Sequence, residues 1–119
     1  MHFRQEIGKW GEKLACQYLK ENNYNIIEKN FFCRQGEIDI IAKDNQKQEL
    51  VFVEVKTRSN LRYGNPIDSV NKQKQRHIKR VANYYLYKTN SYKLAVRVDV
   101  IEIYLQPTSY KINHIKQIF

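Results

Sequence analysis

The sequence predicts an α/β sandwich in which a mixed sheet carries a helix on each face. Apolar residues recur every three or four positions near residues 3–22 and 70–86, as they do along amphipathic helices. Segments rich in β-branched and aromatic residues lie between and after these two stretches, and short polar turns join them. The predicted order is helix, three strands, helix and strand, with a last short strand, in a single domain spanning residues 1–119.

The first helix is expected from Phe3 to about Asn22. Glycine costs about 1 kcal/mol relative to alanine inside a helix, so Gly8 and Gly11 indicate a close backbone approach to another element or to a ligand. The apolar stripe of this helix contains Phe3, Ile7, Trp10, Leu14, Tyr18 and Leu19.

Three strands should follow, at Tyr24–Cys33, Gly36–Ala42 and Leu50–Lys56. The polar connection between the second and the third strand, residues 44–48, is short enough for an antiparallel hairpin. Asp68 or Ser69 is the expected N-cap of the second helix. The apolar stripe of that helix contains Val70, Ile78, Val81, Ala82, Tyr85 and Leu86.

A fourth strand is expected over residues 93–105 and a short final strand over residues 110–119. Apolar residues of the fourth strand change parity between Val100 and Ile101, which predicts a bulge or a change of covering element at this point. Arg97 and Asp99 lie on the other parity, and we expect them to pair with each other or with polar groups of the sheet.

Charge and composition narrow the compartment and the partners. The 21 Lys and Arg against 12 Asp and Glu give a net charge of +9, which favours a polyanionic partner. Charge alone does not separate DNA, RNA and anionic membranes, but no apolar run approaches the roughly 20 residues of a membrane-spanning helix. Without a signal-like start the chain should be cytoplasmic, and Cys16 and Cys33 should be reduced thiols. The sequence does not decide whether two copies of the chain form a homodimer.

Candidate chemistry lies in the second and third strands. Side chains i and i+2 share a face of a strand, so Glu37 and Asp39 point one way, while Phe52, Glu54 and Lys56 point together from the next strand. An unpaired carboxylate in an apolar strand costs several kcal/mol, so Glu54 needs a partner. Two carboxylates and a lysine suit Mg²⁺ or Mn²⁺ with a bound water. The alternative is a simple Glu54–Lys56 pair on a half-exposed edge strand.

These residues resemble a known signature. An aspartate on one strand, followed on the next by an acidic residue, one apolar residue and a lysine, is similar to the PD-(D/E)xK nuclease superfamily with its restriction-endonuclease-like αβββαβ core. Asp39, Glu54, Val55 and Lys56 carry this likeness, although Ile38 replaces the usual proline. The chain also resembles the YraN family, which is similar to archaeal Holliday-junction resolvases, through Gly8, Gly11, Glu12, Ala15, Tyr18, Leu19, Asn30, residues 36–39, residues 52–58, Arg97 and Asp99.

The resemblance implies a nuclease site. Asp39 and Glu54 would hold Mg²⁺ or Mn²⁺, and Lys56 would position the attacking water. In resolvase-like relatives a glutamate of the first helix helps to hold the metal, and Glu12 matches that position. An ordinary solvated glutamate is the alternative for Glu12, because it lies off the apolar stripe.

Basic residues in two regions are candidates for contact with nucleic acid. Arg58 and Arg62 can bind phosphate and Tyr63 can stack on a base, although residues 59–66 also suit a solvated loop. Lys74 falls on the apolar stripe of the second helix, where a lysine either snorkels or reaches an anion. The neighbouring cations Lys72, Arg76 and Lys79 suit nucleic-acid contact or a soluble outer face.

The predicted function is therefore a metal-dependent endonuclease acting on DNA or on structured nucleic acid, with no membrane partner. The alternative is a nucleic-acid-binding or partner-recruiting module that keeps the fold without efficient cleavage. The enzyme needs a metal and both carboxylates, Asp39 and Glu54, whereas the binding module needs only its basic surface.

Overall fold

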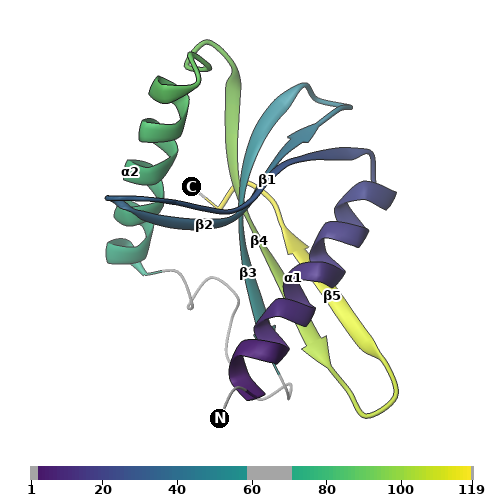
Figure 1. Cartoon of the computed structure of the whole chain (residues 1–119). Coiled ribbons are helices and arrows are strands. Elements are labelled where there is room, and N and C mark those ends of the chain that lie inside the picture. The colour runs from purple at the N-terminus through teal and green to yellow at the C-terminus, as the bar shows by residue number, and fades with distance from the viewer. Residues whose placement is uncertain (1–2, 59–70, 119) are drawn as a thin grey trace.

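The computed structural model describes residues 3–58 and 71–118, with side chains from residue 6 onward. The predicted element order is confirmed, from the first helix to the last strand (Figure 1). The elements are α1 (Phe3–Glu21), β1 (Tyr24–Cys33), β2 (Gly36–Asp44), β3 (Glu49–Arg58), α2 (Lys72–Lys88), β4 (Ala95–Leu105) and β5 (Tyr110–Ile115). No helix in this part of the chain is both long and apolar enough to cross a membrane.

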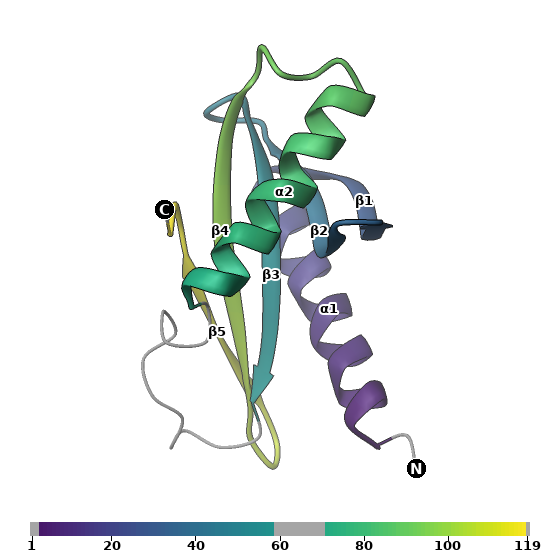
Figure 2. The same cartoon turned by 90° about the vertical axis from the view of Figure 1, so that its left-hand side faces the viewer.

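The strands form one mixed sheet in the order β1-β2-β3-β4-β5. Neighbouring strands are antiparallel except for β3 and β4, which run parallel and are connected through α2. In Figure 2, α2 lies in front of the sheet and α1 lies behind it. The expected sandwich, with a helix on each face, is therefore confirmed.

Each helix covers its own apolar core. Leu14, Ala15 and Leu19 of α1 form one buried cluster with residues such as Val53 and Ile101 of the sheet. On the other face, Ile78, Val81, Ala82 and Tyr85 of α2 form a second cluster with β-strand residues that include Phe52 and Ile38. Burial of such aliphatic side chains stabilises the fold by about 1.5–3 kcal/mol each, so the two helices fix the sheet between them.

Gly11 explains how closely α1 approaches β3. A Cβ atom added at Gly11 would overlap Oγ1 of Thr57, so glycine is needed for this close contact. At Gly8 a Cβ atom would meet nothing within 4 Å among the described residues, so Gly8 makes no such close approach to another element. We expected Trp10 on the apolar stripe of α1 that packs against the sheet, but Trp10 is 49% exposed. The buried side of α1 centres instead on the small residues Gly11 and Ala15.

The second helix begins later than expected. Asn71 is its N-cap, and the side-chain oxygen of Asn71 accepts a hydrogen bond from the backbone nitrogen of Lys74 at 2.8 Å. The residues we expected to cap it, Asp68 and Ser69, lie outside the described residues, as does Val70.

The parity change in β4 occurs where the helix that covers its apolar side chains changes from α2 to α1. Val98 and Val100 belong to the core under α2, whereas Ile101 and Ile103 belong to the core under α1. The ladder between β3 and β4 runs without a register shift, so the bulge that we considered is not present there. Because β4 passes from under one helix to under the other, its apolar residues switch faces along a regular strand.

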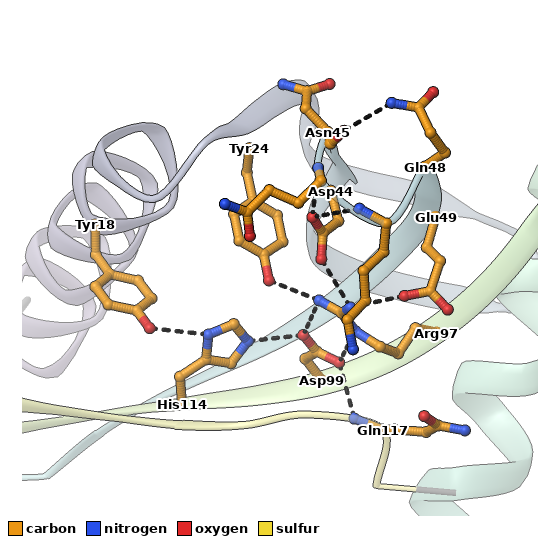
Figure 3. A network of polar contacts seen from close by, with 12 residues as sticks. Tyr18, Tyr24, Asp44, Asn45, Gln48, Glu49, Arg97, Asp99, His114 and Gln117 are labelled. Atoms are coloured by element: carbon orange, nitrogen blue, oxygen red, sulfur yellow. Dashed lines mark hydrogen bonds and ion pairs between the residues drawn. The ribbon is translucent and has the colours of Figure 1, made fainter.

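Arg97 lies at the centre of a buried polar network beneath the C-terminal end of α1 (Figure 3). Its guanidinium donates to Asp99 from Nε at 2.9 Å, to Asp44 at 2.9 Å and to Glu49 at 2.8 Å. It also donates to the hydroxyl of Tyr24 at 2.7 Å. The predicted pairing of Arg97 with Asp99 is confirmed, and the network joins β1, β2, β3 and β4.

Asp99 extends this network to the last strand. His114 Nε2 lies 2.7 Å from Asp99 Oδ2, and His114 Nδ1 lies 3.0 Å from the hydroxyl of Tyr18 on α1. The backbone nitrogen of Gln117 donates to Asp99 Oδ1 at 3.0 Å. These hydrogen bonds and the Arg97 guanidinium hold the pKa of Asp99 below its usual value despite its burial. One carboxylate therefore fixes β5 to α1 and β4.

Candidate active site at the divergence of β2 and β3

Strands β2 and β3 separate at Asp39. Their ladder ends with Ile40 opposite Val53, one position before Asp39 would face Glu54. Ile38 belongs to the core under α2 and Ile40 to the core under α1, so the backbone of β2 turns over between them. Oδ2 of Asp39 accepts a hydrogen bond from the backbone nitrogen of Val55 at 2.8 Å. A side-chain carboxylate thus takes the place of a strand carbonyl where pairing stops.

Glu54 is the buried member of the site. Its side chain is 5% exposed, and Oε2 lies 3.4 Å from Nζ of Lys74 on α2. Burial, followed by the negative charge of Asp39, raises the pKa of Glu54 to about 7, although Lys74 and Lys56 act in the opposite direction. The structure therefore brings Lys74 to the acidic pair from the apolar face of α2, as its position on the stripe suggested.

Asp39 is subject to the same opposing effects on its pKa as Glu54. Burial raises its pKa, while the Val55 N–H and the charges of Lys74 and Lys56 lower it. Two carboxylates and two lysines from β2, β3 and α2 therefore act on one another. The charges of Lys56 and Lys74 act on both Asp39 and Glu54, and the catalytic and metal-binding roles of these residues stay predictions.

Glu12 approaches this centre from the other face of the sheet. It is half-buried on α1, and burial together with the charge of Asp39 raises its pKa. A hydrogen bond from the side chain of Asn30 partly offsets this effect. Asp39 is therefore within electrostatic range of Glu12 on one side and of Lys74 on the other. The sequence did not reveal the contact with Asn30, because the pairing of α1 with β1 depends on the packed fold.

The donor set fits a hard divalent cation held by few protein ligands. Two neighbouring carboxylates with raised pKa values are stabilised in their charged forms by a cation, and Mg²⁺ prefers oxygen ligands and retains several waters. Within residues 3–58 and 71–118, no three His, Cys, Asp or Glu side chains are gathered into one potential metal cluster. A cation at this site would thus rest on Asp39 and Glu54 and complete its shell with water.

Arg58 has a partner that the sequence did not predict. Its Nε donates to Oε2 of Glu102 at 2.9 Å, and Glu102 is fully buried. The hydroxyl of Tyr104 donates to Oε1 of the same glutamate at 2.6 Å. Glu102 lies opposite Lys56 in the parallel ladder, a register that the two strand patterns alone could not give. Arg58 therefore anchors the end of β3 to β4, and its contact with nucleic acid stays a prediction.

The other predicted nucleic-acid residues fall into two groups. Lys72, Arg76 and Lys79 lie on the exposed side of α2, next to the half-buried Lys74. Arg62 and Tyr63 lie outside the described residues. The α2 cations thus lie on the same face of the sheet as Glu54, and their role in binding stays a prediction.

Comparison with known proteins identifies relatives along nearly the whole chain. Residues 11–103 match the model of the family described as "Uncharacterised protein family UPF0102". The UPF0102 protein of Clostridium beijerinckii is 49% identical over 117 residues, which cover 97% of this chain and 94% of that protein. That of Caldicellulosiruptor bescii is 47% identical over 118 residues, which cover 97% of this chain and 98% of that protein. The UPF0102 family is also known as YraN, so that resemblance is confirmed.

Among solved structures, the likeness is distant. SfsA of Pyrococcus furiosus in complex with Ca²⁺ matches with a TM-score of 0.37 and 12% sequence identity, over 93% of this chain and 62% of that chain. A likeness at this level carries no conclusion about activity.

Proposed function

This chain belongs to the UPF0102 family, and from its buried acidic centre we propose that it is a metal-dependent endonuclease that hydrolyses phosphodiester bonds of DNA or structured nucleic acid. The observation that carries the proposal is the meeting of Asp39 and Glu54 where β2 and β3 separate, with Lys56 and Lys74 beside them. Buried like charges are costly, and such costs are concentrated at functional sites.

A bound Mg²⁺ or Mn²⁺ would polarise the phosphate and supply a water with a lowered pKa. Asp39 and Glu54 would be its ligands, and Asp39 is held in place by the Val55 N–H. Lys56, whose charge acts on both carboxylates, orients the attacking water and stabilises the charge that develops on the phosphate. Attack on phosphorus breaks one P–O bond of the diester, leaving a phosphate monoester and a hydroxyl end.

Two further residues support this assignment from opposite faces of the sheet. Glu12 would help to hold the cation from the α1 side of the sheet, since the charge of Asp39 acts on it. Lys74, now 3.4 Å from Glu54, can turn to a substrate phosphate once a cation neutralises the carboxylate. The net charge of +9 favours a nucleic-acid substrate.

The proposal predicts cleavage that depends on both carboxylates and on Lys56. Purified protein with Mg²⁺ or Mn²⁺ should cut at least one member of a panel of single-stranded, flapped and four-way-junction DNA and RNA. Asp39→Asn and Glu54→Gln should lower cleavage at least about 100-fold, because each removes a metal ligand. Lys56→Ala should lower it by a similar factor while metal binding persists. Lys43→Ala, a half-buried lysine farther along β2, is the matched control and should cut like the wild type.

Binding without cleavage would favour the other reading of the same residues. If the wild type binds the panel but cuts no member with either metal, the protein is a nucleic-acid-binding or partner-recruiting module with a nuclease-like core. Cleavage that survives Asp39→Asn and Glu54→Gln would instead place the activity elsewhere.

A further inference from the structure

A groove of about 710 Å³ lies between α1 and β1, on the opposite face of the sheet from α2. Three lysines of α1 line one wall, namely Lys9, Lys13 and Lys20, and Lys29 of β1 lies across from them. Glu12 and Asn30, which hydrogen-bond each other, also line this α1–β1 groove. The proposed site therefore lies near a concave, lysine-lined surface on the α1 side of the sheet, in addition to the cations of α2.

The α1–β1 groove is cationic and its lysines are available. Among the residues that the structure describes, none of its four lysines forms an ion pair within 4 Å. The carboxylates lining it are Glu12 and Glu21, so the positive groups exceed the negative ones. Lys20, Lys29 and Cys16 all line this groove, and the charges of the two lysines partly offset the effect of burial, which raises the pKa of the Cys16 thiol.

The groove leads to the acidic centre through Glu12. Glu12 lines the groove, and its pKa is raised in part by the charge of Asp39. Asn30, which also lines the groove, lies on β1 between the pairs Lys29–Ile40 and Phe31–Ile38, and therefore beside Asp39 of β2. A polyanion lying in the groove would have one of its phosphates close to the carboxylates.

The spacing of the lysines suits an extended polyanion. Lys9 and Lys20 are separated by about 16 Å along the helix axis, at 1.5 Å per residue. Phosphates of one strand recur about every 3.4 Å along a duplex axis and carry one charge each, so several phosphates can lie along this wall. The concave shape distinguishes the groove from the flat cationic face that an anionic membrane would need.

We propose that the α1–β1 groove binds the sugar–phosphate backbone of the nucleic-acid strand whose scissile phosphate lies at Asp39 and Glu54. Lys9, Lys13, Lys20 and Lys29 contact phosphates, and Asn30 holds Glu12 at the inner end of the groove. The inference rests on the proposed function for the place of the scissile phosphate. Strand binding itself needs no metal, so the two can be tested separately.

Lysine footprinting tests the groove on the unmodified protein. The wild type is acetylated with an acetylating reagent in EDTA, alone and with saturating single-stranded, duplex or four-way-junction DNA or with RNA, and each lysine is quantified by mass spectrometry. The four groove lysines should be protected at least about fivefold, whereas Lys47, Lys93 and Lys111, which are exposed elsewhere, should not. Equal modification of the groove lysines with and without every nucleic acid would overturn the inference.

Matched triple variants test the energetic contribution. Lys13→Ala, Lys20→Ala and Lys29→Ala together remove three groove charges, and the combination of Lys47→Ala, Lys93→Ala and Lys111→Ala removes three exposed charges elsewhere. In EDTA the groove triple should bind a fluorescent single strand at least about tenfold more weakly than the control triple. The slope of log Kd against log salt should fall by about 0.7 per lost phosphate contact. Equal affinities of the two triples would contradict the proposal.

The outcomes separate this inference from the proposed function. Protection of the groove lysines and weaker binding by the groove triple in EDTA, without cleavage in Mg²⁺, would support the groove as a nucleic-acid site and contradict the nuclease proposal. Cleavage by a protein whose groove lysines are not protected would support the nuclease proposal and contradict the groove as the binding site. Protection by anionic phospholipid vesicles but by no nucleic acid would overturn the inference in favour of a membrane surface.

Discussion

Glu54 makes the fold and the proposed chemistry depend on the same side chain. Its carboxyl group is almost completely buried beside Asp39, and its pKa rises from 4.5 to about 7. An acid whose pKa is raised by folding stabilises the folded state in its protonated form. This contribution is complete below the unfolded pKa of 4.5 and is lost as the pH rises through about 7.

Replacing Glu54 by glutamine should therefore remove a pH dependence. In EDTA, the stability of the wild type relative to Glu54→Gln should fall by on the order of 3 kcal/mol between pH 4.5 and pH 8. Urea unfolding at both pH values measures the difference, and the comparison cancels groups of opposite sign such as Asp99, whose pKa is lowered. A difference that is the same at both pH values would show that Glu54 does not titrate in this range.

At the level of single residues, sequence patterns identify charged side chains that interrupt apolar patterns, but they do not identify the partners of these side chains. Glu54 and Lys74 were recognisable because each interrupts an apolar pattern, and they lie 3.4 Å apart. Glu102 also lies in a strand, yet its contact with Arg58 depends on the parallel register of β3 and β4. That register pairs two strands that lie far apart in the sequence, which local periodicity does not encode.

The contact between α1 and β3 can be tested through its glycines. Gly11→Ala would place a methyl group against Thr57 and should destabilise the protein by about 1–3 kcal/mol. Gly8→Ala is the matched control, because its Cβ would meet nothing within 4 Å and alanine favours a helix by about 1 kcal/mol. Thermal or urea unfolding measures both variants.

Thr57→Ala should recover much of the loss caused by Gly11→Ala, since it removes the closest atom. If Gly11→Ala is as stable as Gly8→Ala, the close approach of α1 to Thr57 is not a feature of the folded protein in solution.

Element boundaries were predictable wherever periodicity and turn chemistry agree. Tyr24–Cys33 follows its β-branched and aromatic content, and the polar residues 44–48 mark the hairpin between β2 and β3. The face of α1 was less predictable. Trp10 lies at helical spacing from Leu14, but the small residues Gly11 and Ala15 decide which side lies against the sheet. Side-chain size at a contact is a tertiary property that an apolar stripe alone does not reveal.

At the scale of the whole molecule, the Arg97 network joins all five strands, β1 to β5, and α1 around buried charges. Arg97→Leu would leave Asp99 and Asp44 buried without their cation and should destabilise the protein by about 3–5 kcal/mol. Arg34→Leu, at an exposed position, is the control and should stay within about 0.5 kcal/mol of the wild type. Urea unfolding gives both values, and a loss below about 1 kcal/mol for Arg97→Leu would mean that water replaces the guanidinium.

The two polar centres of the molecule differ in how their charges are balanced. Around Asp99, hydrogen bonds with the Arg97 guanidinium, the His114 ring and the backbone nitrogen of Gln117 hold the carboxylate in its charged form. Around Asp39 and Glu54, burial raises both pKa values, with a further contribution from Glu37 to Asp39 and from Asp39 to Glu54, and these effects outweigh the two lysines. The arrangement around Asp99 stabilises the fold. At Asp39 and Glu54, a divalent cation would offset the cost of the buried negative charges.

Metal-dependent stability tests this central claim most directly. The melting temperature of the wild type, Asp39→Asn and Glu54→Gln is measured at pH 7.5 in EDTA and in increasing Mg²⁺ or Mn²⁺, at constant ionic strength. A cation that binds only the folded state raises stability by RT ln(1 + [L]/Kd), about 2.7 kcal/mol at 100 times Kd. The wild type should therefore show a saturable rise in Tm that both variants largely lose. Equal rises in all three proteins, or none in the wild type, would contradict a metal site at Asp39 and Glu54.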